Sequence, residues 1–251
     1  YVIKDSTLFT SAEDAKFLLE TVDEIWARVE KRDNWTDETS KFVYHDSIER
    51  ARLVYQQIIL KHPESQVFRM PAPDTSRVLL KTNKGDIIID LFRDWSPNGV
   101  DRFYNLVRYG FYNNARFFRV REKGFVQFGV HGEPAIAKLW RHQQILDDPV
   151  MTSNRRGRVA FAMGYEPHDR TTQIYINLKD KPELVKINFA PIGEVIMGMN
   201  VVGSIYSEYG ESAGGGIRGG HQDSLFESGN EYLKEYFPKL DFIIEALVIQ
   251  N

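Results

Sequence analysis

The chain has 251 residues, and its 42% of hydrophobic and 13% of aromatic residues are enough to build a core, so an intrinsically disordered protein is excluded. There are 32 Lys and Arg against 35 Asp and Glu, and this net charge of −3 gives no reason to expect nucleic-acid binding, which usually shows as a basic excess. The absence of cysteine excludes disulfides, thiolate metal sites and cysteine nucleophiles. No apolar run approaches the roughly 18 residues needed to cross a bilayer.

Residues 10–62 have the periodicity of helices. An apolar stripe with spacings of three and four residues begins at Ala15 and ends at Val29, and a second stripe runs from Tyr44 to Ile58. We therefore predict an antiparallel helical hairpin over residues 1–65, with no evident duty. Its stripes could pack on each other, on the rest of the chain, or on a partner, so residues 10–62 are candidates for partner binding or self-association.

The second half of the chain has a different pattern. Residues 66–76 contain two prolines and are predicted to be a linker, and residues 77–251 are predicted to form the main domain. Its helices are expected at residues 97–109 and 199–205, with an amphipathic helix within residues 226–240. Its strands are expected at residues 77–80, 85–91, 117–121, 125–130, 158–163, 172–177, 190–195 and 242–249. Many short strands with few helices indicate a closed barrel or a sandwich.

An arginine stands inside one of these predicted strands. The segment 117–129, FFRVREKGFVQFG, places Arg119 among aromatic and branched residues, with Gln127 eight positions later. Taken alone, such an arginine is usually a salt-bridged residue at the rim of a barrel, or one that extends its charged tip into water. Gln127 alone would be an outward-facing strand residue.

The motifs around this segment resemble a known family. They are GDIIIDL, SPNGVDRFYNLVRYGFYNNARFFRV, GFVQFG, RVAFAM, TTQIYIN and FAPIGEVIMGMNVV. In this order and spacing they resemble the cyclophilin-type peptidyl-prolyl isomerases, over residues 77–250. The resemblance implies a mainly β fold with some α, an eight-stranded antiparallel β-barrel with a helix over each open end. It does not extend to residues 1–65.

The resemblance also implies site residues. Arg119 matches the catalytic arginine of the family, because it follows an aromatic pair, and Gln127 matches a pocket glutamine. Gln173 matches a second glutamine, with Tyr175 in the place of the usual phenylalanine. The residues that would pair with substrate backbone are Met163 and Gly164.

The chain departs from the family pattern at the proline pocket. Gly124 and Phe125 stand where the family has a phenylalanine–methionine pair. A tryptophan that many relatives carry is missing, and Leu184 is the nearest apolar candidate for its place. The family's histidine near the end of that loop falls at Phe189 or Asn188, and we favour Phe189. Because members without the tryptophan typically bind cyclosporin poorly, weak cyclosporin binding is expected.

The chemistry of prolyl isomerisation explains an arginine at this position. A peptide bond resists rotation by about 18–20 kcal/mol because the nitrogen lone pair is delocalised into the carbonyl group. In the twisted transition state the lone pair returns to the proline nitrogen, and a guanidinium can bind this state better than the planar one. Such a site needs no nucleophile, no metal and no cofactor. It needs Arg119, polar anchors at Gln127 and Gln173, and an apolar cup, for which the candidates are Phe125, Met163, Tyr175, Leu184 and Phe189.

The sequence therefore predicts a prolyl cis–trans isomerase that acts on X-Pro segments of other proteins as a folding catalyst or chaperone. Two alternatives stay open: a catalytically weak module that only binds proline-containing peptides, and a protein whose main duty lies in residues 1–65. Slight acidity and absent cysteine fit a periplasmic or secreted protein as well as a cytosolic one, and we slightly favour the former. The glycine-rich segment 212–220 lacks the lysine of a phosphate-binding loop, and the histidines are too scattered for a metal site.

Overall fold

The computed structural model describes residues 52–164, 166–216 and 221–249. The chain divides into two units, residues 1–67 and 68–251. In the first unit residues 52–59 are helical, and the predicted hairpin up to residue 51 lies outside the described residues. None of the described helices has both the length and the apolar character that a membrane span requires.

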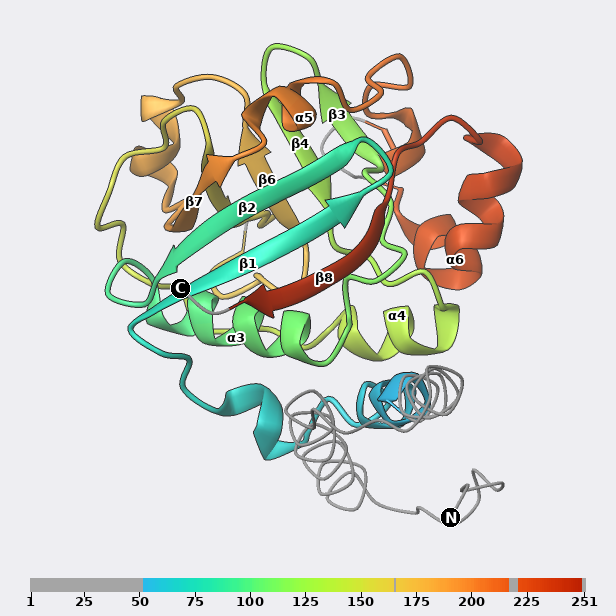
Figure 1. The fold of residues 1–251 in the computed structure, drawn as a ribbon, viewed down its shortest axis with the longest axis horizontal. Helices are drawn as coiled ribbons and strands as arrows, with labels where there is room; N and C mark the ends of the chain where they lie inside the picture. The colour runs from blue at the N-terminus through green and yellow to red at the C-terminus, as the bar shows by residue number, and fades with distance from the viewer. Residues whose placement is uncertain (1–51, 165, 217–220, 250–251) are drawn as a thin grey trace, which may run out of the picture. The chain divides into compact units, whose positions relative to one another are not determined.

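The second unit is built on one curled antiparallel sheet of eight strands (Figure 1). The strands are β1 (Thr75–Thr82), β2 (Gly85–Phe92), β3 (Arg119–Arg121), β4 (Phe125–Phe128), β5 (Arg158–Phe161), β6 (Ile174–Asn177), β7 (Pro191–Met197) and β8 (Ile243–Ile249). Their order across the sheet is β3-β4-β6-β5-β7-β2-β1-β8. The predicted number of strands and their antiparallel pairing are confirmed, with shifts of a few residues at the strand ends.

The predicted eight-stranded barrel is found only as a half-barrel, because the edge strands β3 and β8 are not neighbours in the sheet. A single bridge, Arg116 with Phe242, joins the segments that precede these two strands. The physical reason lies in β3, which has only three residues. The backbone N–H of Val120 donates to the carbonyl oxygen of Gly210 at 2.9 Å, so a loop lies along this edge of β3. The sheet is therefore a curled half-barrel.

Helices cover the sheet and its ends. They are α3 (Pro97–Arg108), α4 (Pro134–Trp140), α5 (Met199–Gly203) and α6 (Asp223–Tyr236), with short 3-10 helices η3 (Pro182–Ile187) and η4 (Ser212–Gly214). A further 3-10 helix, η2 (Gln66–Arg69), spans the boundary between the two units. α3 packs against β2, β7 and β8, and α4 packs against α6. The expected helices correspond to α3, α5 and α6. α4 was not predicted, because its seven residues are too few to show a helical period.

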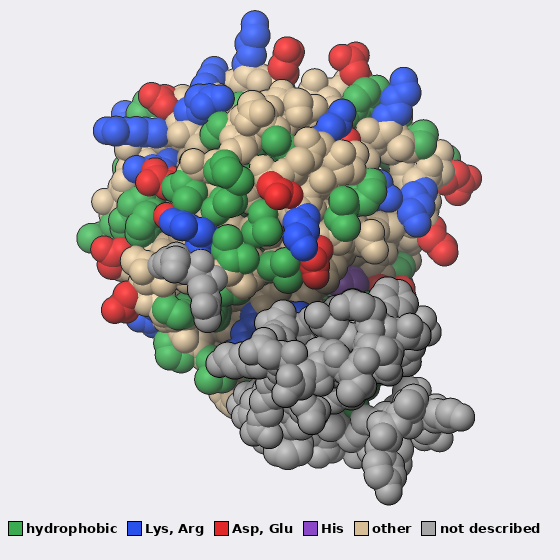
Figure 2. Space-filling view, viewed as in Figure 1, with side chains coloured by type: hydrophobic (Ala, Val, Ile, Leu, Met, Phe, Trp, Pro, Cys, Tyr) green, Lys and Arg blue, Asp and Glu red, His purple; other side chains and the backbone are tan. Residues whose placement is uncertain are grey.

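The two faces of β1 and β2 differ as a half-buried sheet requires. Val78, Leu80, Ile87 and Ile89 are fully buried, because alternate residues of a strand point to the same face. On the outer face Leu79 pairs with Ile88 and with Leu247. Ion pairs border this apolar row, Arg77–Asp90 at 2.6 Å and Lys81–Glu245 at 2.9 Å. Figure 2 shows hydrophobic side chains gathered between charged ones on this face.

A carboxylate distant in sequence caps the N-terminus of α3. Asp148 accepts hydrogen bonds from the backbone N–H of Asn98 at 3.0 Å and of Gly99 at 2.9 Å, and from the hydroxyl of Ser96 at 2.5 Å. It also pairs with Arg170 at 3.0 Å. The Asp148 and Arg170 side chains are only 1% and 2% exposed, so this pair fixes α3, the segment before α3 and the segment before β6 in one buried cluster.

His131 makes the stability of the fold depend on pH. It is buried, its Nδ1 accepts the backbone N–H of Glu133 at 3.0 Å, and burial lowers its pKa from 6.5 to about 4. The unfolded chain therefore binds a proton between pH 6.5 and 4 that the folded chain excludes, so stability is lost as pH falls through this window. We expect the free energy of unfolding to fall by about 2 kcal/mol between pH 7.5 and pH 5 on this account.

Urea unfolding at the two pH values measures this loss. In His131→Asn the amide oxygen can still accept the Glu133 N–H, but the side chain does not titrate. This variant should lose about 2 kcal/mol less than the wild type between the same two pH values. An equal loss in both proteins would show that other groups set the acid sensitivity.

Candidate functional site

The spacing of Arg119 and Gln127 follows from strand pairing. β3 and β4 form a hairpin in which Arg119 lies directly opposite Gln127, and Gln127 lies opposite Tyr175 of β6. Residues opposite one another in neighbouring strands point to the same face. Phe125 and Gln173 share that face, because each lies two residues from a member of this row. The sheet thus brings together five of the predicted site residues.

A chain of hydrogen bonds crosses this face. Arg119 donates from Nη1 to the Gln127 side-chain oxygen at 3.0 Å, and Gln127 donates to the Gln173 side-chain oxygen at 2.8 Å. Gln173 in turn donates to the side-chain oxygen of Gln222, which precedes α6, at 3.0 Å. Gln127 is only 3% exposed, so these bonds fix its amide in one orientation.

A carboxylate that the sequence analysis did not single out holds the other side of the arginine. Glu211 accepts from Arg119 Nε at 3.2 Å and Nη2 at 2.8 Å, and also pairs with Arg121 at 3.3 Å. The Arg119 and Glu211 side chains are 13% and 17% exposed, so water screens their attraction only partly. Arg119 is thus salt-bridged, as a rim arginine usually is, and it also faces the predicted pocket residues.

The guanidinium keeps donors for a further acceptor. It has five N–H groups, of which three donate to Gln127 and Glu211. One N–H on each terminal nitrogen is left over by these bonds. The guanidinium carbon also lies 4.9 Å from the ring centre of Phe125, at cation–π distance. The charge is therefore fixed beside an aromatic ring, and two of its donors have no partner among the described residues.

Three aromatic rings form an apolar wall beside the arginine. The ring of Tyr175 lies 6.1 Å from that of Phe125 and 5.7 Å from that of Phe189, both edge to face. Tyr175 is only 5% exposed, and this burial raises its pKa, so its hydroxyl stays neutral and donates to the Asn154 side chain at 3.1 Å. Asn154 also donates to the Phe189 carbonyl at 2.7 Å. Asn154 thus accepts the hydrogen bond of the Tyr175 hydroxyl, a group that the family's usual phenylalanine at this position lacks. The sequence analysis did not identify Asn154.

The remaining predicted residues lie around this cluster. The backbone N–H of Ala162 donates to the Gln173 carbonyl at 2.9 Å, which places Met163 and Gly164 just beyond β5 and beside Gln173. Leu184 is half-buried in η3, and its carbonyl accepts the backbone N–H of Phe189 at 3.1 Å. No described hydrogen bond or ring contact joins Met163, Gly164 or Leu184 to Arg119.

The structure gives a physical account of two departures from the family pattern. Gly124 closes the β3–β4 turn, where its backbone N–H donates to the Arg121 carbonyl at 2.7 Å, so it adds no side chain to the pocket. Phe125 alone supplies a ring from this pair of positions. Asn188 is exposed and has a left-handed φ of 61°, whereas Phe189 packs on Tyr175. Of the two candidates for the loop position, Phe189 is the one that contacts the aromatic wall.

Comparisons with known proteins match this part of the chain. The family model for cyclophilin type peptidyl-prolyl cis-trans isomerases matches residues 77–215. Peptidyl-prolyl cis-trans isomerase B of Escherichia coli is 32% identical over 182 residues, which cover 69% of this chain and 99% of that protein. A peptidyl-prolyl cis-trans isomerase of Acinetobacter baylyi is 31% identical over 132 residues, or 51% of this chain and 70% of that protein.

A solved structure has the same fold. The crystal structure of a cyclophilin type peptidyl-prolyl cis-trans isomerase from Cryptosporidium parvum aligns with a TM-score of 0.52 and 18% sequence identity. The alignment covers 70% of this chain and 99% of that one. At this identity the match concerns the fold alone.

Proposed function

The chain belongs to the cyclophilin-type peptidyl-prolyl cis-trans isomerase family, and on this premise we propose that it accelerates rotation about X-Pro peptide bonds in protein segments. The observation that supports this best is Arg119, a fixed guanidinium with two N–H groups to spare at the edge of an aromatic wall. The proposed substrates are flexible or unfolded segments, because the proline and its neighbours must enter the site in extended form.

The proposed mechanism is differential binding of the twisted peptide bond. Phe125, Tyr175 and Phe189 receive the proline ring, and Gln127 and Gln173 hold the flanking peptide groups. As the bond twists, the proline nitrogen regains its lone pair and becomes an acceptor for the free N–H groups of Arg119. In a partly dry groove that charge stabilises the twisted state more than it would in water. No proton is transferred and no covalent bond is formed.

Glu211 acts in this proposal as a positioning residue for Arg119. We expect Glu211→Ala to lower kcat/KM for an X-Pro peptide by about tenfold, because the side chain of Arg119 loses its fixed orientation, and a displaced catalytic group costs rate steeply. Most of the loss should fall on kcat. Glu211→Gln keeps an oxygen acceptor for Arg119 and should restore part of the rate.

The two variants also test the opposite role of this carboxylate. Steady-state kinetics at equal fractions of folded protein, checked by thermal unfolding, give the comparison. If Glu211→Ala isomerises faster than the wild type, the carboxylate restrains Arg119 instead of positioning it.

Refolding of a protein limited by a slow X-Pro step tests the proposed function on a protein substrate. Uncatalysed proline isomerisation takes about 10–100 s at 25 °C, so an isomerase shortens this phase at substoichiometric concentration. A module that only binds proline-containing peptides would leave the phase unchanged or slow it. The glycine at position 124, in place of a large pocket side chain, is the observation that favours this second candidate.

A further inference from the structure

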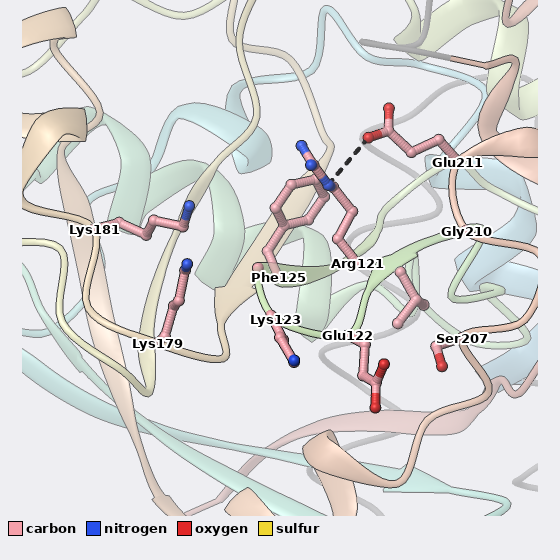
Figure 3. Close-up of a pocket in the computed structure, with 11 residues that line it drawn as sticks. Arg121, Glu122, Lys123, Phe125, Lys179, Lys181, Ser207, Gly210 and Glu211 are labelled. Carbon is pink, nitrogen blue, oxygen red and sulfur yellow. Dashed lines mark ion pairs between the residues drawn. The ribbon is translucent and has the colours of Figure 1, made fainter.

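A hollow lies at the β3–β4 turn, and Phe125 of the aromatic wall is part of its lining (Figure 3). It has a volume of about 630 Å³, which is within the range of small-ligand sites. The β3–β4 hairpin, the segment after β6 and the loop that precedes η4 line it. Phe125 and Glu211 lie both in the lining of the hollow and beside Arg119.

The lining carries an excess of positive charge. Its four basic side chains are Arg121, Lys123, Lys179 and Lys181, against the two acidic side chains of Glu122 and Glu211. Glu211 is already paired with Arg119 and Arg121, so it neutralises little of the remaining charge.

The lysines differ in how far they are paired. Lys181 pairs with Glu183 at 3.4 Å, and the charge of Lys179 also helps to lower the pKa of Glu183, whereas Lys123 forms no ion pair within the described part of the chain. In Figure 3 the amino ends of Lys179 and Lys181 point toward one another, across the pocket from Glu211. Like charges in this arrangement repel, and the single, exposed carboxylate of Glu183 offsets only part of that repulsion, so a further anion would relieve it.

Backbone hydrogen bonds hold these walls in place. The N–H of Leu178 donates to the Gly124 carbonyl at 3.0 Å, and the N–H of Val120 donates to the Gly210 carbonyl at 2.9 Å. The N–H of Lys181 donates to the Asn154 carbonyl at 2.7 Å. The turn and both neighbouring segments are thus tied together, so the positions of the basic side chains are built into the fold.

We propose that this basic pocket binds an acidic side chain of the substrate, within about three residues of the proline. The inference rests on the proposed isomerase function, since it names the class of X-Pro segment that the groove prefers. One extended residue spans about 3.3–3.6 Å, so a peptide seated on the Phe125 side of the groove reaches the pocket within a few residues. A carboxylate there would pair with Lys179 and Lys181, which among the described residues share the exposed carboxylate of Glu183.

Matched peptides that differ only by Gln or Glu at one position test the proposal. The position is varied over the three residues on each side of an Ala-Pro centre, and kcat/KM is measured by exchange NMR at low salt. We expect one position at which Glu raises kcat/KM at least about fivefold over Gln, and we expect 0.5 M NaCl to reduce this preference, because salt screens the ion pairs. No preference above about twofold at any position would overturn the proposal.

Two double variants separate the pocket from the overall charge. Lys179→Gln/Lys181→Gln should abolish the preference for Glu. Lys138→Gln/Lys234→Gln removes the same charge from exposed positions on α4 and α6, and this variant should keep the preference for Glu. An equal loss in both variants would assign the preference to net charge and overturn the proposal.

The proposed function can fail separately from this inference. If the wild type turns over the Gln peptides but shows no preference for Glu, the isomerase function stands and the acid-binding pocket falls. If the protein turns over no peptide, the isomerase function is wrong, and NMR titration then tests the pocket by itself. Tighter binding of the Glu peptide than of the Gln peptide would support the pocket, and equal dissociation constants would overturn it.

Discussion

Replacing Arg119 by alanine is expected to lower kcat/KM for an Ala-Pro-Phe peptide by at least about tenfold, which is about 1.4 kcal/mol of transition-state stabilisation. The variant removes the only described cation that contacts both Phe125 and Gln127, and with it the donors for the proline nitrogen. Peptide binding should weaken much less than turnover, because the aromatic wall and the glutamines remain.

Arg119→Lys is the informative control. It keeps a positive charge but loses the planar fork that donates to Gln127 and Glu211 at the same time. We expect it to recover only a small part of the activity. If Arg119→Ala keeps wild-type turnover while thermal unfolding shows it to be folded, Arg119 is a structural rim residue and the proposed mechanism is wrong.

Replacing Asp148 by alanine is expected to lower the free energy of unfolding by about 3–5 kcal/mol, the usual cost of breaking a buried ion pair from one side. Arg170 would keep only its longer ion pair with Asp147 at 3.3 Å, and the N–H groups of Asn98 and Gly99 would lose their acceptor at the start of α3. Urea unfolding at pH 7.5 measures the loss.

A surface carboxylate provides the comparison. Asp90 pairs with Arg77 at the half-exposed outer face of β1 and β2, and Asp90→Ala should cost far less, because water already screens that pair. Asp148→Ala/Arg170→Met removes both charges and should recover part of the lost stability. If Asp148→Ala costs no more than Asp90→Ala, the buried pair does not stabilise the helix start.

The parts of the site that sequence could predict lie on neighbouring strands with fixed spacing. Arg119 and Gln127 are opposite residues of one hairpin, and Gln173 and Tyr175 lie on one face of the next strand. Their spacing in the sequence therefore indicates that these side chains lie close together. Glu211 is different, because it lies in an irregular loop and is 92 residues away from Arg119 in the sequence. Local periodicity carries no sign of such a pair.

The same distinction holds for Asn154 and for Asp148. Asn154 lies outside the regular elements, and its contact with Tyr175 depends on how the loop after α4 folds back over the sheet. Asp148 caps α3, which begins about 50 residues earlier in the chain. The sequence next to Ser96 indicates this helix start only by a proline at its first position. The side chain of Ser96 does not cap the helix itself and donates instead to Asp148.

At the level of the fold, alternation of apolar and polar residues predicted the strands, whereas closure of the sheet was not a local property. β1 and β2 alternate over eight residues each, and their hairpin was evident. Whether β3 meets β8 depends on the loop around Gly210, which takes the hydrogen bond of Val120. This loop also carries Glu211, so the feature that leaves the sheet open also supplies the partner of Arg119.

The most direct test of the central claim is exchange NMR on an Ala-Pro-Phe peptide with substoichiometric wild-type protein and with Arg119→Ala. The account predicts that the wild type speeds cis–trans exchange and that the variant loses at least about tenfold of this acceleration, or about 1.4 kcal/mol of barrier lowering. Peptide resonances should still shift in the presence of the variant. If the wild type leaves exchange at its uncatalysed rate while the resonances shift, the groove binds proline-containing peptides without isomerising them, and the claim is contradicted.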